Sequence, residues 1–372
     1  MENYNLKTGW LEELLRLHDQ IKTSADTITQ LKATLDALLL WSTFAPIPSN
    51  LKGQPQDAIH DVKTKLEAAS FSCLTCEKET GTFAYVANSG SDTVSVIDTS
   101  SNTVVDTVPV GVAPRGIAVT PNETFVYVAN SSSNTVSVID TSSNTVVATV
   151  PVEITPFDVV VTPNGQFAYV TNAGSATVSV IDTSSNTVVD TVPAGSAPHG
   201  IAVTPDGIFA YVANFGSATV SIIDTSSNTV TTTVPVGVGP FNVAITPNRE
   251  FAYVTNAINN NVSVIDISSN TVIATVSAGA APVDVAITPD GQFAYIVNFL
   301  TNNVSVVDTS SNTVTATIAV GFLPFGIAIT PDGQFAYVTN LGSATVSVID
   351  TSSNTATVTV PVGIGPFSVA IQ

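Results

Sequence analysis

The feature that most constrains this chain is a segment of 42 residues that returns seven times. A tyrosine in FAYV-type segments recurs at 85, 127, 169, 211, 253, 295 and 337. An aspartate that ends VSVID-type segments recurs at 98, 140, 182, 224, 266, 308 and 350. The repeats fill residues 79–372 of the 372-residue chain. A fixed period in this range indicates a repeat architecture.

One repeat contains four short apolar runs separated by turn residues, as between Gly200 and Gly237. Val, Ile, Thr, Tyr and Phe dominate the runs, which is typical of strands. The TPDG and TPNG segments carry the proline, Asp or Asn, and glycine of tight turns, and DTSSN offers side chains that bond nearby amides. Runs such as VSVID are apolar on both faces, so each four-stranded antiparallel sheet is expected to have neighbours on both sides.

Four-stranded units of this length predict an all-β, seven-bladed β-propeller. The repeats begin with FAYVAN at 83–88 and end with PFSVAIQ at 366–372, which corresponds to an innermost strand alone. The first blade lacks that strand. We therefore expect the C-terminal strand to complete blade one, which closes the ring and leaves no unpaired sheet edge between the two ends.

Residues 1–78 follow a different period and are predicted to form an α-helical segment. Apolar residues spaced three and four apart from Leu14 to Leu38 resemble a coiled-coil seam, and a second helix is expected over 56–69. Two arrangements remain open: a coiled-coil stalk that forms a homo-oligomer through 14–38, or a helical hairpin. Cys73 and Cys76 lie in the following linker, either as free or locally oxidised thiols, or as inter-chain disulfides or a shared metal site.

Charge limits the partners of this chain. It has 10 Lys and Arg against 29 Asp and Glu, and the repeats contain only Arg115 and Arg249 as basic residues. Such a body repels phosphate backbones and anionic lipid, so we expect no nucleic-acid partner. No apolar run is long enough for a transmembrane segment, and no signal peptide is visible at the start, which leaves a cytoplasmic location as one alternative.

The loops that lead into each innermost strand end in a proline, and the residues after it are expected to ring the mouth of the central channel. They form a mostly apolar set with a few polar groups, which is typical of a ligand or partner site. An alternative is that the phenylalanines plug the channel. The candidate residues are Arg115, Phe157, Asp158, His199, Phe241, Asn242, Asp284, Phe325 and Phe367.

The signals for catalysis are weak, and we assign no catalytic residue. His199 is the single histidine of the repeats, and the chain shows neither a Walker-type phosphate loop nor a pair of histidines at metal-ligand spacing. No cofactor and no metal in the ring are therefore expected. An acid–base set or a calcium site made from Asp158, His199, Asp284 and Arg115 would rest only on their expected proximity.

The segments FAYVTN (167–172, 251–256, 335–340), FAYVAN (83–88, 209–214) and the SVID-TSSNTV unit resemble the YVTN family of β-propeller repeats. That family includes surface-layer-type proteins and is similar to lactonase-type propellers, so the resemblance implies a cell-surface or extracellular location. The favoured interpretation is a non-enzymatic scaffold, adhesion or binding module with a protein or carbohydrate partner. The alternatives are a lactonase-like hydrolase with its site at the channel mouth and a ligand-binding sensor ring.

Overall fold

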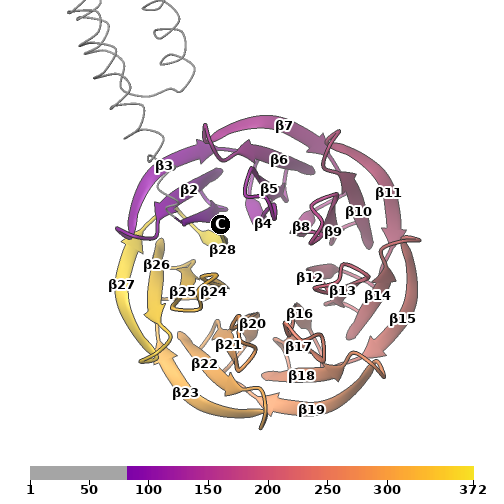
Figure 1. Ribbon diagram of the computed structural model, residues 1–372, viewed down its shortest axis with the longest axis vertical. Coiled ribbons are helices and arrows are strands. Elements are labelled where there is room, and N and C mark those ends of the chain that lie inside the picture. The colour runs from indigo at the N-terminus through magenta and orange to yellow at the C-terminus, as the bar shows by residue number, and fades with distance from the viewer. Residues whose placement is uncertain (1–81) are drawn as a thin grey trace, which may run out of the picture. The chain divides into compact units, whose positions relative to one another are not determined.

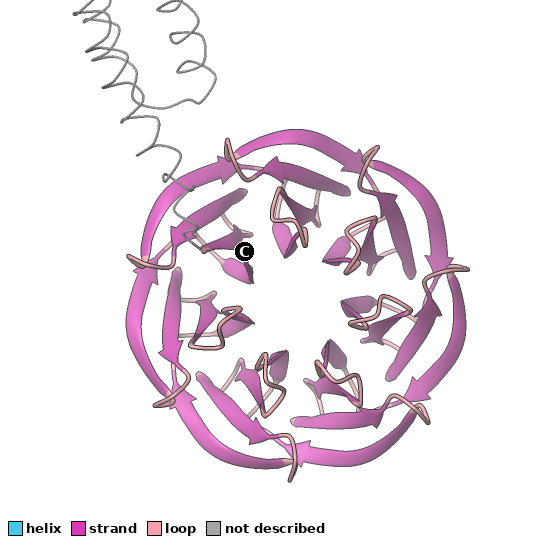
Figure 2. Cartoon of the chain, in the orientation of Figure 1, coloured by secondary structure: helices cyan, strands magenta, loops and turns pink. Residues whose placement is uncertain are grey.

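The computed structural model describes residues 82–372, which form a closed ring of seven four-stranded antiparallel sheets (Figure 1). All regular elements in this part of the chain are strands (Figure 2). The predicted seven-bladed β-propeller is therefore confirmed. The helical segment predicted for 1–78, its stalk and hairpin alternatives, and the linker with Cys73 and Cys76 lie outside the described residues.

Every blade has the same strand order from the channel to the rim. The innermost strands are β4 (Pro114–Val119), β8 (Pro156–Val161), β12 (Pro198–Val203), β16 (Pro240–Ile245), β20 (Pro282–Ile287), β24 (Pro324–Ile329) and β28 (Pro366–Ile371). The second strands are β1 (Phe83–Asn88), β5 (Phe125–Asn130), β9 (Phe167–Asn172), β13 (Phe209–Asn214), β17 (Phe251–Asn256), β21 (Phe293–Asn298) and β25 (Phe335–Asn340). The third strands are β2 (Thr93–Asp98), β6 (Thr135–Asp140), β10 (Thr177–Asp182), β14 (Thr219–Asp224), β18 (Asn261–Asp266), β22 (Asn303–Asp308) and β26 (Thr345–Asp350). The outermost strands are β3 (Thr103–Pro109), β7 (Thr145–Pro151), β11 (Thr187–Pro193), β15 (Thr229–Pro235), β19 (Thr271–Ser277), β23 (Thr313–Ala319) and β27 (Thr355–Pro361).

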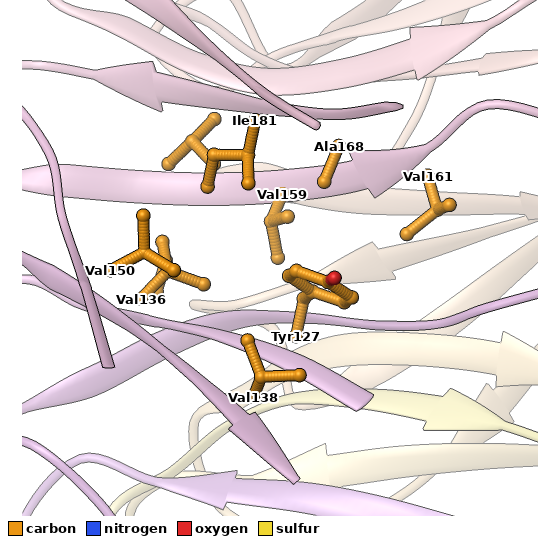
Figure 3. Packing of buried hydrophobic residues seen from close by; sticks show 10 residues of the cluster. Tyr127, Val136, Val138, Val150, Val159, Val161, Ala168 and Ile181 are labelled. Carbon is orange, nitrogen blue, oxygen red and sulfur yellow. The ribbon is translucent and has the colours of Figure 1, made fainter. Parts of the chain in front are cut away.

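The hydrophobic core lies between neighbouring blades. In the cluster shown in Figure 3, Tyr127 and Val138 of one blade pack against Val159, Ala168 and Ile181 of the next. The second and third strands are buried on both faces because each sheet has a neighbour on either side. Burial of these apolar side chains between sheets provides the main stabilisation of the ring.

Hydrogen bonds from the repeated tyrosines tie neighbouring blades together. The Tyr127 hydroxyl donates to Oδ1 of Asn186 in the next blade at 2.7 Å. Five further pairs make the same bond: Tyr169–Asn228, Tyr211–Asn270, Tyr253–Asn312, Tyr295–Asn354 and Tyr337–Asn102. The seventh tyrosine differs, because neither the Tyr85 hydroxyl nor Oδ1 of Asn144 has a hydrogen-bond partner among residues 82–372.

The ring is closed by pairing between the ends of the described chain. Strand β28 pairs antiparallel with β1, with Val369 opposite Val86 and Ile371 opposite Ala84. The backbone amide of Gln372 also donates to the Phe83 carbonyl at 2.9 Å. The expected completion of blade one by the C-terminal strand is confirmed.

The two faces of the ring carry different connections. We call the face with the TPDG-type and DTSSN-type turns the turn face. Its turns are held by their own side chains: Asp224 Oδ1 accepts hydrogen bonds from the amides of Ser226 and Ser227 at 2.9 and 3.1 Å. Gly207 has a φ of 76°, which suits glycine in a tight turn. The opposite face, which we call the mouth face, carries the loops from second to third strands and from each outer strand into the next blade.

Candidate functional site at the mouth of the channel

Aromatic side chains close the channel on the mouth face. His199 stacks on Phe157 with ring centroids 3.9 Å apart, and Phe241 contacts both rings edge-on at 4.8 and 5.5 Å. Phe367 lies 5.6 Å from Phe157 and 4.0 Å from Phe325, which in turn lies 5.5 Å from Phe241. The edge-on contacts have a geometry that is favourable between aromatic rings. The structure brings together these predicted residues, and they plug the channel instead of lining an open cleft.

Two further phenylalanines extend the plug and were not predicted from the sequence. Phe215, in the loop between β13 and β14, lies 4.8 Å from His199. Phe299, in the loop between β21 and β22, lies 5.8 Å from Phe325. Both follow the asparagine that ends a second strand, a position that holds Ser or Ala in four other repeats and Leu at 341. The aromatic residue at this loop position is the sequence feature that could have indicated a role in the plug.

Arg115 lies against this aromatic plug. Its guanidinium carbon is 4.9 Å from the Phe157 ring centroid and 5.4 Å from that of Phe367, within cation–π range. Burial lowers the pKa of Arg115, yet an arginine remains charged in proteins. Within residues 82–372 the guanidinium has no ion pair, whereas the other arginine of the ring, Arg249, pairs with Asp206 on the turn face.

His199 is poorly suited to act as a base. Burial, and secondarily the charge of Arg115, lowers the pKa of His199 to about 4. Its Nδ1 is buried and has no hydrogen-bond partner among the described residues. The imidazole is therefore neutral near pH 7, where it contributes an apolar stacking surface to the plug.

A second layer of residues lies directly beneath the plug, around a cavity of about 20 Å³. This volume holds about one water molecule. The cavity is lined by Gly116, Phe157, Asp158, Gly200, Phe241, Asn242, Val283, Asp284, Phe325, Gly326, Phe367 and Ser368. No ligand of ordinary size can be enclosed there while the aromatic rings keep this arrangement.

The two aspartates of this layer bind backbone amides across blade boundaries. Asp158 accepts from the amide of Val159 in its own blade at 2.9 Å and from that of Ile201 in the next blade at 3.2 Å. Asp284 accepts in the same way from Val285 and Ile327, both at 2.8 Å. The side-chain amide of Asn242, one blade earlier, also donates to Asp284. The side chains of this second layer therefore link neighbouring blades by hydrogen bonds.

Burial also changes the protonation of these two carboxyl groups. Desolvation raises the pKa of Asp158 to about 6, although the amides of Val159 and Ile201 act in the opposite direction. Desolvation raises the pKa of Asp284 to about 7, and the negative charge of Asp158 adds to this rise. Both groups therefore hold their protons at a higher pH than an exposed aspartate does.

The acid–base set considered for catalysis is not assembled. Arg115 and His199 contact aromatic rings, and the oxygens of Asp158 and Asp284 bond to backbone amides in the layer below. No hydrogen bond or ion pair joins any two of these four side chains in the described ring. Among residues 82–372, no cluster of three or more His, Cys, Asp or Glu side chains could hold a metal ion.

An apolar crown surrounds the plug on the mouth face. Its members lie in the loops of six blades and are 49 to 67% exposed. The crown consists of Val112, Ile154, Val238, Ile258, Leu300, Phe322 and Ile364. Sequence reasoning missed it, although five members stand two residues before the repeated proline.

Charge separates the two faces strongly. The turn face carries the acidic residues Asp98, Glu123, Asp140, Asp182, Asp206, Asp224, Glu250, Asp266, Asp290, Asp308, Asp332 and Asp350, with Arg249 as its one basic residue. The loops of the mouth face carry Asp92 and Glu153, and Arg115 stands at the channel mouth. The mouth face is therefore close to neutral, while the turn face repels anions.

Comparison with known proteins identifies the family of the ring. The family model described as "Lactonase, 7-bladed beta-propeller" matches residues 76–150 and 190–362, more than half of the chain. The chain belongs to this family. The unmatched parts of the ring are 151–189, which includes Phe157 and Asp158, and 363–372, which includes Phe367. No curated protein matches the chain.

The solved structures that resemble this chain include proteins of different kinds. Hydrazine synthase of Kuenenia stuttgartiensis matches with 26% identity and a TM-score of 0.64, over 69% of this chain and 89% of that one. A functionally unknown protein from Desulfotomaculum acetoxidans matches with 20% identity and a TM-score of 0.68, over 78% and 98%. The dihydro-heme d1 dehydrogenase NirN in complex with DHE matches with 15% identity and a TM-score of 0.61, over 77% and 74%. The last two similarities concern the fold alone.

In residues 82–372 there is no helix of the length and apolar character needed to cross a membrane.

Proposed function

We propose that the ring is a non-enzymatic binding module that holds a protein or carbohydrate partner on its mouth face. The observation that carries this proposal is the aromatic plug, because Phe157, His199 and Phe241 occupy the position where a substrate would have to enter. The exposed crown around the plug supports binding by contact across the face. A scaffold or adhesion role at the cell surface is part of the proposal and rests on the YVTN resemblance.

A lactonase-like hydrolase is the second candidate, and family membership favours it. Hydrolysis needs a group with a pKa near the working pH within reach of the reacting water. His199, with its pKa of about 4 and its stacked ring, does not meet this need. Asp158 and Asp284 have suitable pKa values but lie beneath the plug. A ligand-binding sensor ring has less support, because the cavity holds about one water.

Turnover of γ- and δ-lactones by the full chain tests the proposal, with acid release followed in weakly buffered solution. We expect rates equal to those of the uncatalysed reaction. Catalysed hydrolysis that is lost in both Asp158→Ala and His199→Ala would overturn the non-enzymatic proposal, provided that both variants melt like the parent. A rate unchanged in both variants would point to a contaminating enzyme and leave the proposal standing.

A further inference from the structure

We propose that Arg115 binds a carboxylate of a partner protein, and that the apolar crown packs against apolar residues on either side of that carboxylate. This inference rests on the proposed binding function and names the chemistry of the partner. Three features of the described ring support it: an arginine without an ion pair, an apolar surface too broad for a small ligand, and a charge distribution that disfavours nucleic acid and anionic membranes.

The two arginines of the ring provide the first argument. Arg249 has a carboxylate partner, Asp206, within its own face. Arg115 lies over the rings of Phe157 and Phe367 and has no carboxylate partner among residues 82–372. A partly buried guanidinium has lost hydration, and a carboxylate that pairs with its planar donors compensates for that loss. Arginine beside aromatic residues is also a common centre of binding energy in protein interfaces.

The size of the apolar surface provides the second argument. The crown extends over the loops of six of the seven blades, from Val112 and Ile154 to Phe322 and Ile364. The cavity beneath the plug has a volume of only about 20 Å³. A small molecule could therefore contact only a fraction of the crown and could not be enclosed. A macromolecule that lies across the face can cover both the crown and Arg115.

Charge provides the third argument, because it separates the classes of macromolecule. The ring carries eighteen acidic residues and two arginines, so it repels polyanions such as nucleic acid and anionic membranes far more than a protein segment with a single acid. A second copy of the chain that docks mouth face against mouth face offers few acids to Arg115. Asp92 there accepts from the Ala113 amide at 2.8 Å, and Glu153 is the one other loop acid. A protein segment with an acidic residue among apolar residues fits both the crown and the cation.

The full chain can be tested by selection from displayed random 12-residue peptides, followed by affinity measurements on the selected peptides. We expect enrichment of peptides with Asp or Glu between apolar residues. In the protein, Arg115→Gln should weaken their binding by about 10-fold or more, because it removes one partner of a desolvated ion pair. Arg249→Gln is the matched control on the turn face and should leave the affinity unchanged.

The same peptides test the crown. Ile364→Ser should weaken binding, while Ile208→Ser, at a similarly exposed isoleucine on the turn face, should not. Replacing the peptide's acid by its amide should cause the same loss as Arg115→Gln, and the two changes together should cause little further loss. This coupling separates direct pairing of Arg115 with the peptide's acid from a general effect of the substitution on folding. Arg115→Lys, which keeps the positive charge, serves as a second variant.

Three results would overturn the inference. These are enriched peptides without an acid, equal affinity for the parent and Arg115→Gln, and no enrichment over the bare support. If binding without an acid were still lost in Ile364→Ser, the mouth face would remain the binding face and only the role of Arg115 would be wrong. The proposed non-enzymatic function fails on a different result, lactone turnover that is lost in Asp158→Ala and His199→Ala, so the two failures are distinguishable.

Discussion

The turn face and the mouth face are made from the same seven repeats, yet they use their polar groups in opposite ways. On the turn face the acidic side chains bond to their own turns: Asp140 Oδ1, for example, accepts from the Ser142 and Ser143 amides at 2.9 and 3.0 Å. On the mouth face the loops differ from blade to blade, large apolar side chains are exposed, and Arg115 has no carboxylate partner among residues 82–372.

This difference separates structural from recognition roles within one repeat. A residue that occurs seven times by ring symmetry, such as the aspartate of the DTSSN turn, serves the same local bond seven times. A residue that occurs once, such as Arg115 or His199, breaks the symmetry and gives the face one distinct orientation toward a partner. Specific binding needs such a distinction, whereas ring stability does not.

The largest effect is expected from removing ring closure, on which both faces depend. Deletion of Pro366–Gln372 removes β28, so β1 loses its pairing partner and blade one loses its innermost strand. The exposed sheet edge should cause aggregation and loss of cooperative melting. Size-exclusion chromatography and thermal denaturation by circular dichroism measure this. A soluble truncated protein that melts like the parent would show that neither face needs the closure.

The fold could be predicted from the sequence because the features that build it occur in every repeat. The tyrosine, the turn aspartate and the apolar strands recur every 42 residues, and the lone strand at 366–372 indicates the closure. Symmetry thus provides repeated evidence for each element. Strand bounds and the order within a blade follow from the same signals, since turn residues mark where each strand ends.

The candidate site could be predicted only in part, because it depends on residues that occur once. The proline before each innermost strand placed Phe157, His199 and Phe241 at the mouth, but whether they leave an open cleft depends on side-chain packing. The contributions of Phe215 and Phe299 depend on loops that vary in sequence. Their rings contact residues of other blades, and the 42-residue repeat does not predict contacts between residues that occur only once.

The aspartates beneath the plug and those of the turn face should change the free energy of unfolding with pH in opposite directions. The pKa values of Asp158 and Asp284, about 6 and 7, lie above the value near 4 of an unfolded aspartate. Between about pH 4 and 7 the folded ring therefore holds protons that the unfolded chain has lost, so the free energy of unfolding falls as pH rises. Each group contributes a slope of at most about 1.4 kcal/mol per pH unit.

The turn-face aspartates have the opposite effect, because their contribution to stability rises with pH. The side-chain hydrogen bond from Ser142 lowers the pKa of Asp140, so its contribution to stability is present above about pH 4 and is lost as the pH falls through the folded-state pKa. Chemical denaturation at several pH values measures both effects. Asp284→Asn should flatten the slope between pH 4 and 7, and an unchanged slope would mean that Asp284 does not titrate in this range.

A glycine on each face gives a smaller and sharper contrast. A Cβ on Gly200, in the layer beneath the plug, would collide with the side chain and Cα of Asn242. Gly200→Ala should therefore destabilise the ring by roughly 1 to 3 kcal/mol through overpacking. On the turn face a Cβ on Gly165 would meet only Pro121, at an ordinary contact distance of 3.8 Å. There only the φ of 72° makes alanine costly, by roughly 1 kcal/mol.

Urea denaturation with a second change distinguishes these two causes. Asn242→Gly removes the side-chain atoms that the new methyl group would meet, so it should recover part of the loss in Gly200→Ala. The same change should not affect the loss in Gly165→Ala, because that loss comes from backbone conformation. Equal recovery in both backgrounds would indicate that the contact at Gly200 is not the cause.

The smallest expected effect concerns the tyrosine hydroxyls that reach the asparagines of the turn face. Tyr127→Phe removes the bond to Asn186 and leaves a partly buried amide oxygen unpaired, so a loss of about 1 kcal/mol is expected. Tyr85→Phe removes a hydroxyl that has no partner among residues 82–372, and its effect should be near zero or slightly stabilising. The pair of variants compares the same change at two blade junctions. Equal losses in urea denaturation would show that Tyr85 and Asn144 are bonded in solution, so that all seven junctions of the turn face are equivalent and the asymmetry belongs to the mouth face alone.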